Sequence, residues 1–414
     1  MRVSINTEIA FTYLLSRRKQ TAIAALGVTF GIGMFIFMNS LITGTNEYFE
    51  KMTLSAIPHI RLYNENDMCT SEMLDRYSDA QTINLIGNPQ IVSKDNRIYN
   101  PNSIVHELKQ FSQVMAVSPQ VNTNVIYSNG NVQSNGNVSG VNILEQDKMF
   151  DISSTLVTGS VKDLSISVDG IIIGIGLSKN LNVRKGDNIT LTVSNGAART
   201  LRIVGIFETT IKNIDRARTY ASPSVVQQLL KKDRNYITEI FVNVKDHTRS
   251  TEVASTIQNM TGYSVETWQS ANQQSLAARR IRDVIANSIV VTILIVAGFG
   301  IYNILNMAIY EKIKEIAILK AMGFAGVHVI SIFIRQALFI GILGGMAGLL
   351  FGWGLSYTIS KYYIGLGNVD FLPITFYLRH YLQGFAFGIT TAFFAGYIPA
   401  IKASKVDPVS IIRG

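Results

Sequence analysis

Four long runs of the sequence carry no charged residue, and they constrain the fold more than any other feature. They cover residues 21–43, 284–310, 336–360 and 381–401. A helix of about 20 apolar residues crosses the roughly 30 Å hydrocarbon core of a bilayer, so each run is long enough to span a membrane. The first run is too long for the apolar part of a cleaved signal peptide, and we interpret it as a retained span. The sequence therefore predicts an integral membrane protein with one span followed, after a long connection, by three more.

The net charge of +9 lies mostly beside these runs. Residues 44–283 contain 24 Lys and Arg against 23 Asp and Glu, so the other 13 basic and 5 acidic residues supply nearly all of the excess. A nucleic-acid-binding protein concentrates its positive charge on a folded face instead. We therefore expect no nucleic-acid partner, and we expect the lipid bilayer as the main surroundings of the spans.

The basic residues near the span ends predict the orientation, because such residues stay in the cytoplasm. They lie before the first span, between the second and third spans, and after the fourth: Arg2, Arg17, Arg18, Lys19, Lys312, Lys314, Lys320, Lys402, Lys405 and Arg413. Both termini are predicted to be cytoplasmic, with residues 44–283 outside the cytoplasm. The cluster Arg279, Arg280 and Arg282 does not follow this rule, because four spans with a cytoplasmic N-terminus place it outside the cytoplasm. We give the number of spans more weight than this one cluster.

The connection 44–283 is long enough for a domain with its own core. Within residues 170–207, alternating apolar positions and turns at 185–187 and 195–196 predict half-buried sheet with a short helix. Helical spacing over 104–111 and 251–260 and a strand over 239–244 complete an α+β pattern. The polar stretch 64–102 is predicted to be an insertion or a long loop.

The sequence contains no motif of an enzyme. It has no Gly-Lys dipeptide, so the phosphate-binding loop of ATPases is absent. The single cysteine, Cys69, has no partner for a disulfide and no neighbours at metal-ligand spacing, and the five histidines are scattered. We expect no catalytic residue, no metal and no cofactor.

Glycines recur at intervals of four in three of the spans. Small residues at this spacing allow helix backbones to approach closely, although glycine is also common in membrane helices generally. The series in the third span is the longest. The predicted packing residues are Gly27, Gly31, Gly344, Gly348, Gly352, Gly384 and Gly388.

The loop between the second and third spans has the spacing of a short amphipathic helix. In residues 309–323, Ile309, Ile313, Ile316 and Ala317 fall on one face, and Gly323 is a natural helix stop. The periodicity alone favours a helix that rests on the membrane surface, with docking to a cytoplasmic partner as the alternative.

Several segments resemble a known family. "EIAILKAMGF", "FIRQALFIGILGGMAGLLFGWGL" and the closing "GYIPAIKASKVDPVSIIRG" are similar to the FtsX-like permease domain of ABC transporters in the MacB and LolC/LolE group. "VAGFGIYNILNMAIYEK" and "IPHIRL" resemble the LolC/LolE branch in particular. "GLSKNLNVRKGDNITL" with "LRIVGIFETT" resembles the periplasmic core domain of that family.

The resemblance implies a bacterial inner-membrane permease that pairs with a second permease subunit and receives a separate ATPase on the helix 309–323. The implied domains are an N-terminus with the first span over 1–43, a MacB-like periplasmic domain over 44–283, and an FtsX-like permease domain over 284–414. The implied ATPase-docking residues are Ile309, Ile313, Glu315, Ile316, Leu319, Lys320, Met322 and Gly323.

The implied function is extraction of lipoproteins or other amphiphiles from the outer face of the inner membrane, with a periplasmic carrier or adaptor as a further partner. MacB-like efflux of peptides or drugs and FtsX-like signalling to a cell-wall hydrolase are the alternatives. The family's LolC members carry a proline-bearing loop that captures the lipoprotein carrier, between strands that correspond to 188–193 and 201–206. Only residues 194–200 connect them here, so no such capture loop is expected.

Overall fold

The computed structural model describes residues 5–16, 18–65, 96–209, 211–366 and 369–413. Cys69 and most of the predicted insertion 64–102 lie outside these ranges. The chain divides into two compact units, Glu50–Leu276 and a second unit made of Met1–Phe49 with Ala277–Gly414. We refer to them as the sheet unit and the membrane unit.

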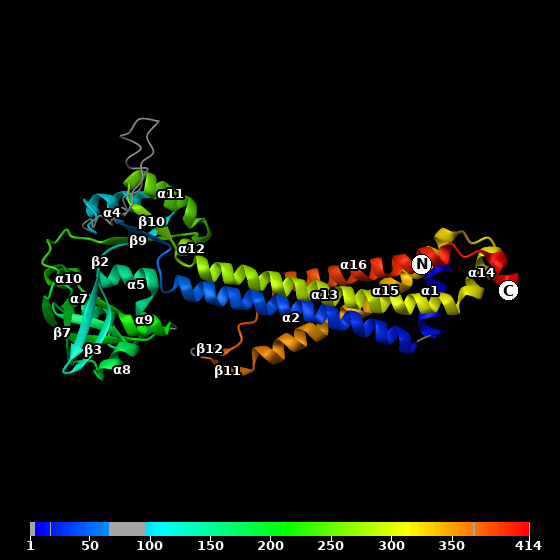
Figure 1. Cartoon of the computed structure of the whole chain (residues 1–414), viewed down its shortest axis with the longest axis horizontal. Coiled ribbons are helices and arrows are strands. Elements are labelled where there is room, and N and C mark those ends of the chain that lie inside the picture. Colours follow the sequence, from blue (N-terminus) through cyan, green and yellow to red (C-terminus); the bar gives the residue numbers. More distant parts are fainter. Residues whose placement is uncertain (1–4, 17, 66–95, 210, 367–368, 414) are drawn as a thin grey trace, which may run out of the picture. The chain divides into compact units, whose positions relative to one another are not determined.

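In the described part of the sheet unit, ten strands form one mixed sheet (Figure 1). Its order is β10-β1-β9-β2-β3-β8-β5-β7-β4, and β6 pairs with β2 and β7. The pairs β3–β8 and β5–β7 are parallel and the others are antiparallel. The strands are β1 (Ile60–Tyr63), β2 (Val114–Asn129), β3 (Val132–Val141), β4 (Leu156–Thr158), β5 (Gly170–Gly174), β6 (Asn188–Val193), β7 (Ala198–Phe207), β8 (Arg218–Ala221), β9 (Glu239–Val244) and β10 (Ser264–Thr267).

Short helices cover both faces of this sheet. They are α4 (Pro101–Gln110), α5 (Ile143–Phe150), α6 (Ile152–Thr155), α7 (Val161–Ile166), α8 (Ile175–Leu181), α9 (Lys212–Ala217), α10 (Pro223–Leu229), η1 (His247–Arg249), α11 (Ser250–Thr261) and α12 (Trp268–Ala271). The predicted helices 104–111 and 251–260 correspond to α4 and α11, and the predicted strand 239–244 is β9.

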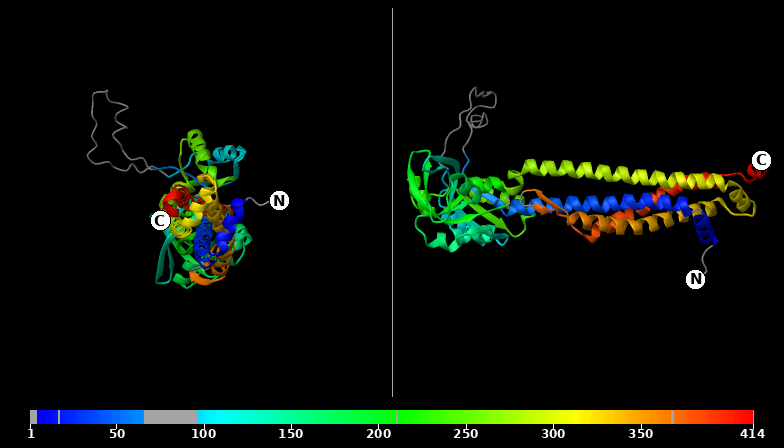
Figure 2. Two further views of the ribbon diagram at one scale, coloured as in Figure 1. Left: turned by 90° about the vertical axis from the view of Figure 1, so that its right-hand side faces the viewer. Right: turned by 90° about the horizontal axis from the view of Figure 1, so that it is seen from below.

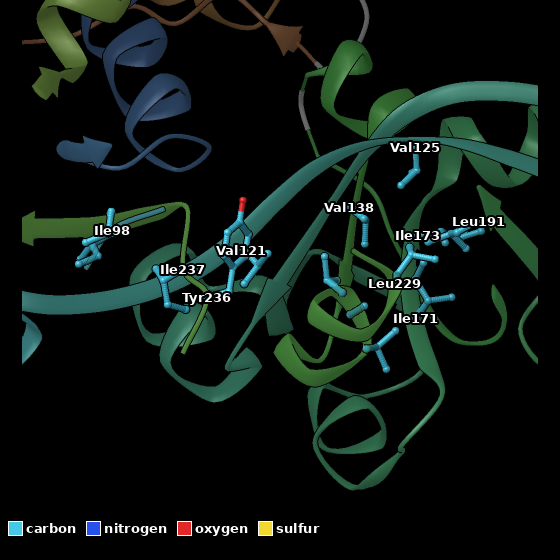
Figure 3. Packing of buried hydrophobic residues seen from close by; sticks show 14 of the residues in the cluster. Ile98, Val121, Val125, Val138, Ile171, Ile173, Leu191, Leu229, Tyr236 and Ile237 are labelled. Atoms are coloured by element: carbon cyan, nitrogen blue, oxygen red, sulfur yellow. The ribbon is translucent and has the colours of Figure 1, made fainter. Parts of the chain in front are cut away.

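The core lies on both sides of the sheet. Strand β5 shows the division: Ile171 and Ile173 belong to the larger apolar cluster, whereas Ile172 belongs to a second cluster under α5 and α7. Successive side chains of a strand point to opposite faces, so a strand buried on both faces is apolar throughout. Figure 3 shows side chains of the larger cluster from several strands, among them Val121 and Val125 of β2 and Ile171 of β5.

The hairpin β6–β7 follows the predicted pattern. Residues Ile189, Leu191 and Val193 are buried, and the residues between them are more exposed. Its turn is tight: Gly196 has φ +79°, and the Val193 N–H donates to the Ala197 carbonyl at 3.0 Å. The short connection leaves no room for a protruding loop here.

Within the described residues, four helices are long and apolar enough to cross a membrane: α2 (Arg18–Leu54), α13 (Gln273–Glu311), α15 (Gly326–Ser360) and α16 (Leu378–Ser404). They run side by side in the views of Figures 1 and 2. The membrane unit also holds α1 (Ile5–Ser16), α14 (Ile313–Ala321), α17 (Pro408–Arg413) and the hairpin β11 (Tyr363–Leu366) with β12 (Val369–Phe371). The predicted fold class is confirmed: one span, an α+β domain, then three spans.

The boundaries differ from those expected at 43 and 284. Helix α2 continues to Leu54 and α13 begins at Gln273, so both helices extend past their uncharged runs. A polar bridge holds these extensions together, because Asn46 accepts a hydrogen bond from Arg282 and donates one to Asp283 at 3.2 Å. Arg282, which runs against the charge rule, therefore has a structural partner on α2.

The third span packs its glycines against the first. A Cβ at Gly344 would lie 2.7 Å from the Val28 Cβ, and one at Gly348 would lie 2.9 Å from the Ile32 Cβ. At Gly352 the corresponding distance, to Ile36, is 3.0 Å. These distances are too short for a real Cβ, so glycine is what permits the two backbones to lie this close. We call this contact the α2–α15 seam.

The other predicted glycines have different surroundings. A Cβ at Gly384 would lie 3.1 Å from Ile36, and one at Gly388 would overlap Ile32, so α16 packs on the same residues of α2. At Gly31 the neighbour is Ala297 of α13, at an ordinary 3.4 Å. Gly27 has nothing within 4 Å and therefore takes no part in close packing in this chain.

The seam predicts a difference between two glycines of the same helix. Gly344→Ala should lower the melting temperature of the purified protein, because the added methyl group forces apart α2 and α15, and overpacking of this kind costs about 1–3 kcal/mol. Gly354→Ala, with nothing within 4 Å, is the matched control and should leave the melting temperature unchanged or raise it. Equal effects of the two substitutions would contradict the seam.

Candidate functional site

The segment that the sequence marked for docking lies at the end of the membrane unit that also carries α1 and α17 (Figure 1). One continuous helix over 309–323 was expected, and the structure divides it. Helix α13 ends at Glu311 and α14 begins at Ile313, because Lys312 leaves the helical conformation with φ −97° and ψ 11°. Lys312 also pairs with Glu315 in the first turn of α14.

Gly323 ends α14 in the expected way. It has φ +95°, its N–H donates to the Lys320 carbonyl at 3.0 Å, and the Phe324 N–H donates to the Leu319 carbonyl at 3.1 Å. These two bonds form a Schellman motif, which favours glycine because of the left-handed backbone. The role of Gly323 is thus to stop the helix.

One face of α14 is buried in the bundle. Ile316 and Ala317 are 1% and 0% exposed, and Ile309 at the end of α13 is 5% exposed. Ile309 and Ile316 join an apolar cluster with residues of α2 and α15. Ile309 and Ile316 were expected to contact a partner, and the structure corrects this, because side chains enclosed by their own bundle are not available to another protein.

Lys320 also faces inward. Its Nζ donates to the carbonyls of Ser404 and Val406, at 2.9 and 2.6 Å, where α16 ends. The last carbonyls of a helix have no partner within the helix, and a lysine placed there satisfies them and favours the negative end of the helix dipole. Lys320 therefore fixes α14 to the end of α16 and is not free to bind a partner.

The other face of α14 forms one wall of an open groove. Ile318 and Met322 are 51% and 66% exposed, and Leu319 is half-buried between them. The opposite wall is α1, which contributes Ile9 and Tyr13. The groove has a volume of about 360 Å³, and Glu8, Thr12 and Glu315 complete its lining. We call it the α1–α14 groove.

Tyr13 links the two walls. It forms a hydrogen bond with Glu315, and burial together with the charge of that carboxylate raises the pKa of Tyr13 to about 12. The hydrogen bond from Lys312 keeps the pKa of Glu315 below its usual range. Lys312 also lies over the Tyr13 ring, 5.3 Å from the centroid. The groove is therefore apolar along its floor, with the neutral Tyr13 phenol and the ionised Glu315 carboxylate at its rim.

Of the eight predicted docking residues, three line this groove: Glu315, Leu319 and Met322. Ile313 is half-buried outside it. The predicted docking residues did not include Ile318 or any of the residues that α1 supplies. The apolar and aromatic positions of α1 were visible in the sequence, but nothing there indicated that α1 lies next to α14. In the part of the chain that the structure describes, no group of His, Cys, Asp and Glu is arranged to hold a metal ion.

Two family models match this chain. The MacB-like periplasmic core domain matches residues 21–260, and the FtsX-like permease C-terminal domain matches residues 287–408. The lipoprotein-releasing system transmembrane protein LolC of Neisseria meningitidis serogroup B is 20% identical, and the alignment covers 99% of each chain. LolE of the same system in Haemophilus influenzae is 21% identical over 98% of each chain. The macrolide export ATP-binding/permease protein MacB of Wolinella succinogenes is 33% identical over 30% of this chain and 18% of that protein.

Proposed function

Because the chain belongs to the family of ABC transporter permeases that join a MacB-like periplasmic core domain to an FtsX-like permease domain, we propose that it is the membrane subunit of a lipoprotein-releasing transporter. The cargo is a lipoprotein or another lipid-linked amphiphile, which is taken from the outer face of the inner membrane. Energy comes from ATP hydrolysis in a separate subunit.

One observation favours lipoprotein release over the alternative functions. The LolC and LolE relatives align with this chain from end to end, including the domain between the first two spans. The MacB relatives align over less of both chains: MacB of Wolinella succinogenes covers 30% of this chain, and MacB of Psychrobacter arcticus, at 23% identity, covers 72% of this chain and 46% of that protein. MacB-like efflux of a peptide or drug, and FtsX-like signalling to a cell-wall hydrolase, are the alternatives that a cargo experiment separates.

The α1–α14 groove is the docking site for the ATPase in this proposal. Its floor is apolar and its exposed Ile318 and Met322 are not covered by any described residue, which is typical of an interface anchor. The inward face of α14 is fixed by Ile316 and Lys320 to the helices that span the membrane. A displacement of α14 by the ATPase is therefore passed to those helices and is not absorbed by a loose loop.

This function requires a defined topology and assembly. The groove and both termini face the cytoplasm, and the sheet unit lies in the periplasm. The transporter contains two permease chains, identical or related, and the sheet units receive a periplasmic carrier or adaptor.

The docking proposal predicts the effect of charge in the groove. The double variant Ile318→Asp with Met322→Asp should lose at least about 2 kcal/mol of binding to the ATPase, roughly thirtyfold in affinity, because two carboxylates would be buried against its surface. Pull-down of the cognate ATPase and its stimulated ATP hydrolysis should fall together. Val327→Asp, at a 73% exposed position at the start of α15 and outside the groove, is the matched control. If the double variant binds as well as the control, the groove is not the docking site.

Topology is tested with two reporters in a Cys69→Ser background. Ile166→Cys, at an 82% exposed position of the sheet unit, should react with a membrane-impermeant thiol reagent in intact spheroplasts. Val327→Cys, at a 73% exposed position next to the groove and outside its lining, should react only after the cells are permeabilised. The reverse pattern would place the groove outside the cytoplasm and contradict the proposal.

The cargo is tested by purifying the transporter with its ATPase held in an inactive state. Mass spectrometry of the copurified material should find polypeptides with an acylated N-terminus, and these should be released when ATP is supplied to the active complex. Recovery of unmodified peptides or drugs alone would favour the efflux alternative.

A further inference from the structure

The sheet unit contains a cavity of about 470 Å³ that the transport proposal does not use. It lies over strands β1, β9, β2 and β3, on the face opposite the larger apolar cluster. The alternation along β2 shows this: Val117, Val121 and Val125 point into the cluster, whereas Gln120 and Asn122 line the cavity. Its volume is within the usual range of small-molecule sites, roughly 300–1,000 Å³. We call it the sheet cavity.

The floor of the sheet cavity is polar and organised around one carboxylate. Glu239 is 7% exposed and accepts hydrogen bonds from Gln120 Nε2 at 2.9 Å and from Asn122 Nδ2 at 2.6 Å. Arg61 pairs with Glu239 and, at 3.2 Å, with Glu266. Amides and ion pairs of this kind cost free energy to bury, and an ordinary sheet face in the same position carries apolar side chains.

Two polar atoms of this floor are buried without a hydrogen-bond partner among the described residues: Gln120 Oε1 and Arg61 Nε. Gln120 is 1% exposed, so its oxygen is enclosed. One atom is an acceptor that needs a donor, and the other is a donor that needs an acceptor. Gln120 and Arg61 both contact the Glu239 carboxylate. The unpaired acceptor and the unpaired donor therefore lie in the same part of the cavity floor.

The charges and the walls narrow the class of ligand. Arg61 and Arg218 balance Glu239 and Glu266, so the lining has no net charge and favours a neutral ligand. A hydroxyl group is neutral and both donates and accepts, so a ligand that carries several hydroxyl groups can satisfy both the acceptor and the donor. The aromatic residues Phe241 and Trp268 form part of the wall and offer apolar faces for the carbon skeleton of such a ligand.

We propose that the sheet cavity binds a neutral polyhydroxylated ligand with the size of a mono- or disaccharide. The hydroxyl groups hydrogen-bond to Gln120 and Arg61 on the polar floor, and a ring of the ligand packs against the aromatic wall. This site is independent of the proposed transport function, and the binding experiment uses the permease chain alone.

The chain offers a reporter for the test. It contains two tryptophans, Trp268 in the cavity wall and Trp353 in α15, so a Trp353→Phe background leaves only the cavity reporter. The protein is purified without sugar-based detergents, since a maltoside headgroup is itself a saccharide. Glucose, N-acetylglucosamine and maltose are each titrated to about 50 mM, which reveals dissociation constants in the millimolar range and below. We expect a saturable change of Trp268 fluorescence with at least one of the three.

Two variants tie that signal to the site. Gln120→Leu should raise the midpoint at least tenfold, because the buried acceptor is lost, whereas Gln133→Leu at an exposed position of β3 should not change it. Ala271→Phe, at the exposed rim, fills the cavity without disturbing the floor, and it should abolish the response even where Gln120→Leu proves too unstable to purify. The melting temperature of each variant reports whether it is folded.

Three results would overturn the proposal. The first is the absence of any fluorescence response to all three saccharides. The second is a response that both Gln120→Leu and Ala271→Phe leave unchanged. The third is equal binding of a neutral amide without hydroxyl groups, N-acetylalanine methylamide, which would assign the cavity to peptides instead.

Discussion

The close approach of α2 and α15 is the contact on which the membrane unit depends. Inside a bilayer the surrounding lipid is as apolar as the helices, so burial of apolar surface gives little drive for association, and contact distance decides how strongly two helices attract. Gly344, Gly348 and Gly352 remove the side chains that would hold α15 away from Val28, Ile32 and Ile36. Thr29 adds a hydrogen bond across the seam to the Gly344 carbonyl at 3.1 Å. The rigid contact that a transport cycle needs is thus provided by the glycines of the α2–α15 seam, which have no side chains.

The two units place their charged residues differently. The membrane unit keeps them near or beyond the ends of its uncharged runs, as in the contacts of Lys320 with the end of α16 and of Arg282 and Asp283 with Asn46. The sheet unit instead buries Glu239 and Gln120 inside a domain that also has two apolar clusters. Buried polar groups are tolerated when they are paired, and unpaired ones at the surface of a cavity point to a ligand. The sheet cavity carries the proposal of a small-molecule site because its unpaired polar atoms belong to residues that line a cavity.

The sequence predicted the elements whose pattern is set locally. The four spans follow from uncharged length, and the hairpin at 195–196 follows from alternation plus a turn that glycine permits. It did not predict where α2 ends or where α13 begins, because an uncharged run marks the part of a helix in the hydrocarbon and not the whole helix. It also placed Ile309 and Ile316 at the docking surface, since helical periodicity defines two faces without saying which one the bundle covers. The α1 wall of the groove and the polar floor of the sheet cavity arise from contacts between segments that are distant in the sequence. The periodicity of one segment does not indicate which other segment packs against it.

The chain leaves the sheet unit through two adjoining strands, and this has a mechanical consequence. Strand β1 follows α2, strand β10 precedes α13, and the two pair antiparallel with Ile60 opposite Thr267 and Tyr63 opposite Ser264. The residues nearest to the two helices are therefore opposite each other at one end of the ladder. A force that draws α2 and α13 apart acts on this end first and breaks the hydrogen bonds between β1 and β10 one at a time. A force that slides β1 along β10 acts on all of these hydrogen bonds at once. The same few bonds thus yield to splaying of the helices and resist sliding between them.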